Sequence, residues 1–167
     1  MKKLITIMAA FLLLGTMCFA ADPTEGFWIS VDEKTGQETA GWQILQSGGK
    51  LTGKILSVAD QPQDTKATGG KGKSYDNFMN GKDVSNFTTV GTNWIWDLTK
   101  QEEGKWANGY IIDPSDGKRY KCKITFHKAD GKKYKTDTLE MRGEIGMGIG
   151  RSQYWKKATE AEASALR

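Results

Sequence analysis

The segment RYKCKITFH, residues 119–127, alternates apolar and polar side chains with a period of two. This period is the one that a β-strand imposes, because successive side chains of a strand point to opposite faces of the sheet. One face of the segment carries the side chains of Tyr120, Cys122, Ile124 and Phe126. The pattern therefore predicts a strand whose apolar face lies inside the protein.

Seven other stretches rich in Trp, Tyr, Ile, Thr and Val have the composition of strands, and most are separated by short turn segments that contain glycine. They cover residues 26–31, 40–46, 51–58, 94–99, 106–112, 138–142 and about 150–156. Alternation groups Trp94, Trp96 and Leu98 on one face, and Trp106, Tyr110 and Ile112 on one face.

Short antiparallel strands joined by hairpins favour an all-β fold, an eight-stranded up-and-down barrel with a short C-terminal helical tail. A closed barrel is favoured over a sandwich because closure removes both exposed sheet edges. Residues 59–93 are too long and too polar for a hairpin, and they predict a long loop.

The glycine-rich segment RGEIGMGIGRSQYW, residues 142–155, allows two interpretations. A phosphate-binding loop would open a helix, whereas this segment leads into the strand-like RSQYWKK. Glycines within strands instead mark bends, bulges or close backbone approach. We therefore expect bends near residues 143–150 that let the last two strands curl back to meet the first.

The N-terminus has the pattern of a secretory signal peptide, because Lys2 and Lys3 precede an apolar run over residues 4–14 that ends in small residues. Cleavage after Ala20 predicts a mature domain of residues 21–167 that is periplasmic or secreted. The apolar run is too short for a membrane span. Removal of residues 1–20 takes away Lys2 and Lys3 and lowers the formal charge of the chain from +4 to +2. The mixed acids and bases do not predict a nucleic-acid partner.

Catalytic and metal chemistry are weakly represented. The single histidine, His127, has the opposite strand parity to Cys122, so the two cannot form a dyad on a regular strand. One histidine is too few for a typical catalytic zinc site. Asp113 and Asp116 could hint at calcium, but DPSDGK is also an ordinary turn. We expect no metal, no cofactor and no enzyme activity.

The chain has six tryptophans and five tyrosines, which either fill a barrel or line a pocket within it. If a pocket is present, the expected wall or mouth residues are Trp42, Trp94, Trp96, Tyr110, Tyr120 and Tyr154. Arg142 or Arg151 could stack on Trp28, or could recognise a carboxylate head group.

Several motifs together resemble the DUF2147 family of exported bacterial proteins, and GFW at residues 26–28 is similar to the Gly-x-Trp start of the lipocalins and other calycin barrels. The strongest are IDPSDGKRY at 112–120 and the glycine-rich segment at 142–155. The positions expected to be structural are Gly26, Trp28, Asp113, Pro114, Gly117, Gly143, Gly146, Gly150 and Trp155. The resemblance implies a lipocalin-like barrel outside the cytoplasm that binds a small amphipathic molecule.

The sequence thus predicts an exported protein that carries or senses an apolar or amphipathic ligand, such as a fatty acid, in a barrel cavity. The alternative is a filled barrel that contacts an envelope protein through the 59–93 loop and exposed aromatic residues. An enzyme acting on an envelope lipid or glycan has the least support.

Overall fold

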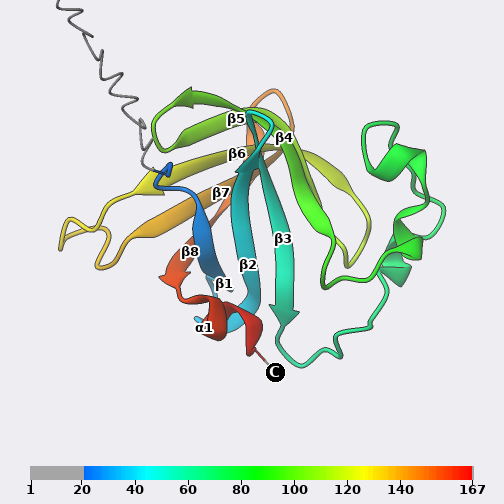
Figure 1. The fold of residues 1–167 in the computed structure, drawn as a ribbon, viewed down its shortest axis with the longest axis horizontal. Helices are drawn as coiled ribbons and strands as arrows, with labels where there is room; N and C mark the ends of the chain where they lie inside the picture. The colour runs from blue at the N-terminus through cyan, green and yellow to red at the C-terminus, as the bar shows by residue number, and fades with distance from the viewer. Residues whose placement is uncertain (1–20, 167) are drawn as a thin grey trace, which may run out of the picture.

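Eight antiparallel strands follow one another around a closed barrel in the computed structural model, which describes residues 21–166 (Figure 1). The strands are β1 (Gly26–Val31), β2 (Glu38–Ser47), β3 (Lys50–Val58), β4 (Asn93–Glu102), β5 (Lys105–Ile112), β6 (Arg119–His127), β7 (Thr138–Gly146) and β8 (Ile149–Ala158). The first strand pairs with the last, with Trp28 opposite Lys157. The predicted eight-stranded barrel is confirmed.

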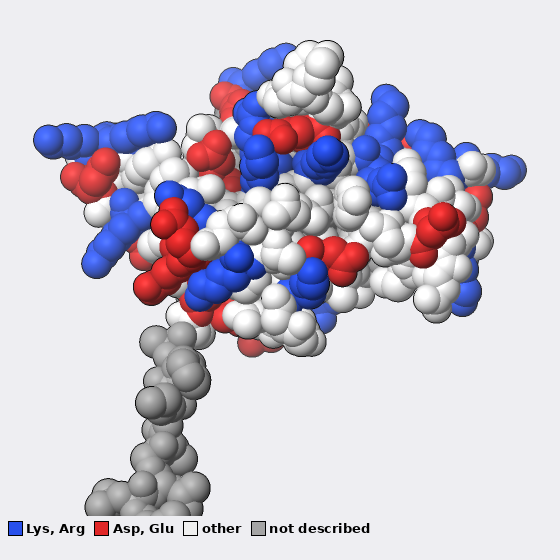
Figure 2. All heavy atoms as spheres, turned by 90° about the horizontal axis from the view of Figure 1, so that it is seen from above, with Lys and Arg blue, Asp and Glu red and all other residues white. Residues whose placement is uncertain are grey.

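The predicted signal peptide, residues 1–20, lies outside the described residues. In the part of the chain that is described, no helix is both long and apolar enough to cross a membrane. On the face shown in Figure 2, Lys and Arg side chains are interspersed with Asp and Glu rather than gathered into one basic patch.

The glycines of residues 143–150 form the β7–β8 hairpin rather than bends that close the barrel. Met147 and Gly148 both have positive φ (45° and 75°), as the two central residues of a type I′ turn do. Closure takes place at the far end of β8, where Lys156–Ala158 pair with β1. The expectation that bends here bring the last strand to the first was wrong, because the glycines serve a tight turn, a register shift between Glu144 and Gly146, and the close approach of two strands. A Cβ on Gly150 would lie 2.2 Å from the Gly143 carbonyl oxygen.

Two positive-φ residues change which side chains face inward. Asp97 (φ 61°) and Asn108 (φ 62°) lie at register shifts in the β3–β4 and β5–β6 ladders. Each shift reverses the alternation, as expected of a bulge. Leu98 therefore does not share a face with Trp96, and Trp106 does not share one with Tyr110. The grouping expected from regular alternation was wrong at both places.

One end of the barrel is tightly packed. Its interior is filled by fully buried side chains, which include Trp28, Trp106, Ile44, Leu51, Leu98, Ile124, Leu139 and Trp155. Residues 21–25 close this end, and the buried Asp22 anchors them. Its carboxylate accepts hydrogen bonds from the Gly104 backbone N–H (3.2 Å) and Trp106 Nε1 (3.2 Å), and it pairs with Lys100 Nζ at 2.8 Å.

Burial alone would raise the pKa of Asp22. Hydrogen bonds donated by Lys100, Thr24 and Trp106 outweigh burial, so the pKa of this carboxyl lies well below its ordinary value. The carboxylate is therefore charged in the folded protein at neutral pH.

The short C-terminal helix α1 (Glu160–Ser164) packs on the outside of β1, β2 and β3. Thr159 and Glu162 form a capping box at its start. The helix can approach closely because Gly41 has no side chain: a Cβ there would lie 1.7 Å from the Ala163 carbonyl oxygen. Ser57 Oγ donates a hydrogen bond to the same oxygen at 2.7 Å. The predicted helical tail is confirmed.

The long loop of residues 59–92 contains three single-turn 3₁₀ helices, η1 (Thr68–Gly70), η2 (Met79–Gly81) and η3 (Val84–Asn86). It projects from the barrel beside β3 and β4 (Figure 1). Its aromatic side chains pack on the outward face of β4: the Phe78 ring lies 5.6 Å from Trp94 and 5.0 Å from Trp96. The loop thus has a small apolar core of its own.

Candidate functional site

A cavity of about 1110 Å³ occupies the end of the barrel opposite residues 21–25. Small-molecule pockets typically have volumes of roughly 300 to 1,000 Å³, so the space is ample for one ligand. The β1–β2, β3–β4 and β5–β6 connections contribute residues to its lining, as do the ends of β7 and β8 beside their hairpin turn. The mouth therefore lies between these connections.

The wall of the cavity is apolar, and inward-facing strand residues make it. Its inward-facing members are Ala40, Trp42, Ile55, Val58, Ile111, Tyr120 and Met141. Ile112, which has the outward parity of Tyr110, also borders the cavity at the end of β5. Trp42 stacks on the fully buried Trp155, with ring centroids 4.7 Å apart, and its Nε1 donates to Ser30 Oγ at 3.3 Å. These contacts hold the indole in place, so the wall is rigid at this point.

The Tyr120 side chain lies beside Gly143, which pairs with Cys122 in the β6–β7 ladder. A Cβ on Gly143 would lie 3.5 Å from Tyr120 Cβ, which is ordinary van der Waals contact. The glycine thus leaves open a part of the cavity that a larger side chain would fill. Its backbone φ is not in the left-handed region, so other residues can adopt it.

The rim of the cavity is polar and carries Arg151 on β8. Arg151 pairs with Gly143 in the ladder and so has the same inward parity, as does Gln153 opposite Met141. Its side chain is 62% exposed, and Glu33 Oε2 lies 3.7 Å from its guanidinium. This contact is loose, so the fork of donors on Arg151 can reach an anionic group at the mouth.

Two acidic side chains at the rim accept hydrogen bonds from residues of their own turns. Asp113 Oδ1 accepts from the Ser115 backbone N–H (2.8 Å) and hydroxyl (2.6 Å), and the Gly117 N–H donates to the Asp113 carbonyl oxygen at 2.7 Å. Asp32 Oδ1 accepts from the backbone N–H groups of Thr35 and Lys34, and these bonds lower its pKa. The turn interpretation of the DPSDGK motif, which includes Pro114, agrees with this geometry.

Over residues 21–166 there is no group of three or more His, Cys, Asp or Glu placed to hold a metal ion.

Three of the predicted aromatic residues lie outside the cavity. Trp94 and Trp96 contact Phe78 of the long loop, and Tyr110 lies 5.6 Å from Trp96. Trp94 Nε1 also donates to the Thr89 carbonyl oxygen at 2.7 Å. The expectation that these three rings line the pocket was wrong. The long loop covers the outward face of β4 and β5, so the rings pack beneath the loop instead.

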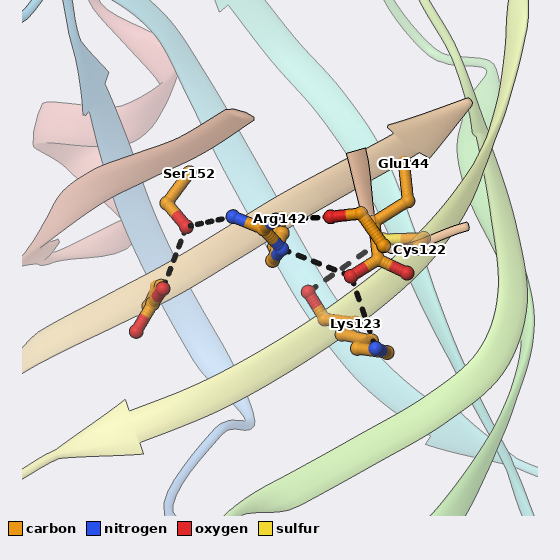
Figure 3. A network of polar contacts seen from close by, with 7 residues as sticks. Cys122, Lys123, Arg142, Glu144 and Ser152 are labelled. Atoms are coloured by element: carbon orange, nitrogen blue, oxygen red, sulfur yellow. Dashed lines mark hydrogen bonds and ion pairs between the residues drawn. The ribbon is translucent and has the colours of Figure 1, made fainter. Parts of the chain in front are cut away.

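Tyr154 and Arg142 are also on the outer surface, since β8 and β7 alternate and the neighbouring positions point inward. Arg142 Nε donates to Glu144 Oε1 at 2.9 Å, and Lys123 Nζ bonds the same oxygen at 3.0 Å (Figure 3). The Tyr154 ring lies 6.4 Å from that of Tyr134. Neither residue lines the cavity, so the expectation that they border it was wrong.

The cation over Trp28 is Lys157, and neither Arg142 nor Arg151 takes this place. Lys157 Nζ lies 4.3 Å from the Trp28 ring centroid and donates to the Glu25 carbonyl oxygen at 2.9 Å. Gly26 leaves room for it, because a Cβ there would lie 2.7 Å from Nζ. This contact closes the seam between β1 and β8 where the barrel joins.

Cys122 and His127 are on opposite faces of β6, as their parity predicts. Cys122 is buried in the interior, and burial raises the pKa of its thiol far above the ordinary value. His127 Nε2 lies on the outer face, 2.8 Å from Glu140 Oε2. The buried thiol is in its unreactive neutral form.

Sequence reasoning missed most of the aliphatic wall. Ile55, Ile111 and Met141 line the cavity, and only Trp42, Tyr120 and Arg151 of the predicted binding residues do so. The alternation of KLTGKILSV contained the signal for Ile55. The prediction favoured aromatic residues instead, because their number is larger than a core of this size requires.

The closed barrel, its packed end and its open cavity define a lipocalin-like protein. Among solved structures, the chain is similar to protein HP1028 from the human pathogen Helicobacter pylori, which is described as belonging to the lipocalin family. The TM-score is 0.64 at 15% sequence identity, over 86% of this chain and 87% of that one. This likeness is one of fold.

The chain belongs to the family described as "Uncharacterized protein conserved in bacteria (DUF2147)", which matches residues 26–157. A search of curated proteins finds no match. The resemblance expected from the sequence motifs is confirmed, and the family match extends from the start of β1 to near the end of β8.

Proposed function

We propose that this protein binds a small amphipathic molecule in its barrel, with an apolar tail inside the cavity and an anionic head group at the mouth. A fatty-acid-like ligand has this chemistry. The single observation that carries the proposal is the arrangement of one cavity, in which an apolar wall leads to a polar rim with a loosely paired arginine.

Arg151 supports the anionic head group. The neighbouring acids Asp32 and Asp113 accept hydrogen bonds within their own turns. The guanidinium of Arg151 makes one long contact with Glu33 and acts on Asp32 only through its charge, which adds slightly to the turn hydrogen bonds that lower the pKa of that carboxyl. A carboxylate at the mouth could accept two hydrogen bonds from this guanidinium.

We propose carriage or sensing rather than catalysis, and action outside the cytoplasm. The signal-peptide pattern of residues 1–20 supports export. The inert Cys122, on the opposite face of β6 from His127, supports a binding role. The open volume favours ligand binding over the alternative of a filled barrel, and Phe78 and Phe87 of the long loop are packed together rather than offered to a partner.

The decisive test is a titration with a long-chain fatty acid, followed by tryptophan fluorescence, because Trp42 lines the cavity. Gly143→Phe should fill the space beside Tyr120 and abolish binding, while Gly143→Ala adds one methyl group and should retain most of it. Native mass spectrometry of protein purified from its own envelope would identify a retained ligand. Equal binding by the Phe variant and the unaltered protein would place the ligand elsewhere.

The head-group assignment has a separate test. Arg151→Gln should weaken binding of a fatty acid about 10- to 150-fold, since a hydrogen bond to a charged group contributes about 1.5 to 3 kcal/mol. The corresponding fatty alcohol should bind the unaltered protein and this variant alike. An equal loss for both ligands would show that Arg151 acts through the shape of the mouth.

A further inference from the structure

The tip of the β7–β8 hairpin is the most exposed apolar surface of the described chain. Ile145, Met147 and Ile149 are 72%, 99% and 60% exposed, more than any other large hydrophobic residue. The other hairpin connections are built almost entirely from glycine and polar or charged residues: 32–37, 48–49, 103–104, 113–118 and 128–137. Only this tip breaks the pattern.

Neither packing nor backbone preference accounts for Met147. Its side chain is almost completely in solvent, and its φ of 45° is one that large side chains rarely adopt. Asn-Gly is the preferred pair for such a turn. A residue that is unfavourable for the turn and makes no packing contribution indicates a role at the surface.

The tip is braced and stands at the mouth of the cavity. Arg142 donates from Nη2 to the Gly148 carbonyl oxygen at 2.8 Å, which ties the turn to the body of β7. Ile145 and Ile149 belong to the cavity lining. An apolar surface therefore runs from the tip into the cavity.

The base of the hairpin is cationic. Arg142 and Lys123 share one carboxylate, Glu144, so this cluster has a net charge of +1 from two bases and one acid. Arg151 at the rim also carries a guanidinium, but the Glu33 carboxylate 3.7 Å away offsets its charge, so the positive charge at the base comes from the Arg142–Lys123–Glu144 cluster. Cations behind an apolar tip would lie at the level of lipid head groups when the tip enters the interface.

We propose that the β7–β8 tip inserts into the surface of an anionic lipid bilayer and brings the cavity mouth against it. A stable second copy or protein partner needs roughly 1,200 to 2,000 Å² of buried surface, which three side chains on a convex tip cannot supply. A bilayer needs no complementary shape. This inference goes beyond the proposed function, because the tip can dock whether or not the cavity holds a ligand.

The test is flotation of the mature protein with vesicles of phosphatidylethanolamine and phosphatidylglycerol. Met147→Asn removes an apolar side chain and places a residue that the turn prefers, so the variant should unfold at the same temperature or higher. We expect its vesicle partition to fall about 10- to 150-fold, which is the factor that corresponds to the roughly 1.5 to 3 kcal/mol gained by burying a Met side chain.

Met79→Asn is the matched control, because Met79 has nearly the same φ (46°) and lies on the long loop, away from the tip. It should float like the unaltered protein. Failure of the unaltered protein to float, or equal flotation of the Met147 variant, would overturn the proposal. So would concentration-dependent dimerisation that Met147→Asn abolishes without any flotation, since that result would identify a second copy as the occupant. A fatty-acid titration in vesicle-free solution tests the cavity separately, and Met147→Asn should not change it.

Discussion

Replacing Asp22 with alanine should destabilise the barrel more than any exposed substitution, because one carboxylate fastens the residues that close the packed end. Asp22→Ala removes the acceptor of four buried donors. Two of them, the Gly104 backbone N–H and Trp106 Nε1, lie outside residues 21–25 and hold this segment to the barrel. Each unsatisfied buried donor costs about 1 to 3 kcal/mol. For the two donors outside residues 21–25, the expected loss in the free energy of unfolding is therefore about 2 to 6 kcal/mol, a large share of the ordinary stability of a domain.

Urea unfolding at neutral pH measures this loss, and a 3 kcal/mol change should also lower the melting temperature by roughly 6 to 12 °C. Glu103→Ala is the matched control, since Glu103 is an exposed acid in the same β4–β5 connection. Its effect should stay within about 0.5 kcal/mol. A loss below about 1 kcal/mol for Asp22→Ala would refute the reasoning, because it would show that water or local movement satisfies both donors.

The same carboxylate predicts a pH dependence. Its pKa is depressed in the folded protein, so its stabilisation is complete above the unfolded pKa of about 3.9 and is lost as the pH falls toward the folded value. The stability difference between the unaltered protein and Asp22→Asn should be largest near neutral pH and should shrink below about pH 4. A difference that stays constant through this range would contradict the assignment.

Three further outcomes follow from close contacts. Gly41→Ala should lower the melting temperature, and should cost much less in a chain that ends at residue 158, because its Cβ clashes with the Ala163 carbonyl group of α1. Cys122 should resist a thiol reagent in the folded protein and react on unfolding in urea; fast labelling of the native state would contradict its burial. Lys157→Met should lose about 0.5 to 1 kcal/mol in thermal unfolding through its contact with Trp28, and an unchanged melting temperature would show that the cation contributes nothing there.

The strands were predictable because alternation and turn residues act locally. All eight predicted stretches correspond to strands, and the alternation of β6 correctly placed Cys122 inside. The faces of β4 and β5 were not predictable from alternation alone. Asp97 and Asn108 adopt left-handed backbone there, which reverses the parity, and a non-local loop covers the outside. Three consecutive apolar residues, Trp94 to Trp96, were the available signal in the sequence that both faces of β4 are covered, and all three are buried.

The candidate site was predicted in part for a related reason. Aromatic content drew attention to Trp42 and Tyr120, which line the cavity, and to Trp94 and Trp96, which do not. A tryptophan packs equally well in a pocket wall or beneath a loop, and sequence alone does not distinguish the two. The cation over Trp28 is set by the pairing register of β8 with β1, which places Lys157 opposite Trp28. Sequence patterns did not predict that register.

The division of the barrel into a packed end and an open end has an evolutionary consequence. Substitutions around the mouth exchange one solvated or cavity-facing side chain for another, so their effect on folding is small. Substitutions at the packed end disturb fully buried tryptophans. Homologous chains can therefore vary the lining of the cavity while keeping one scaffold, and variation among them should concentrate around the opening.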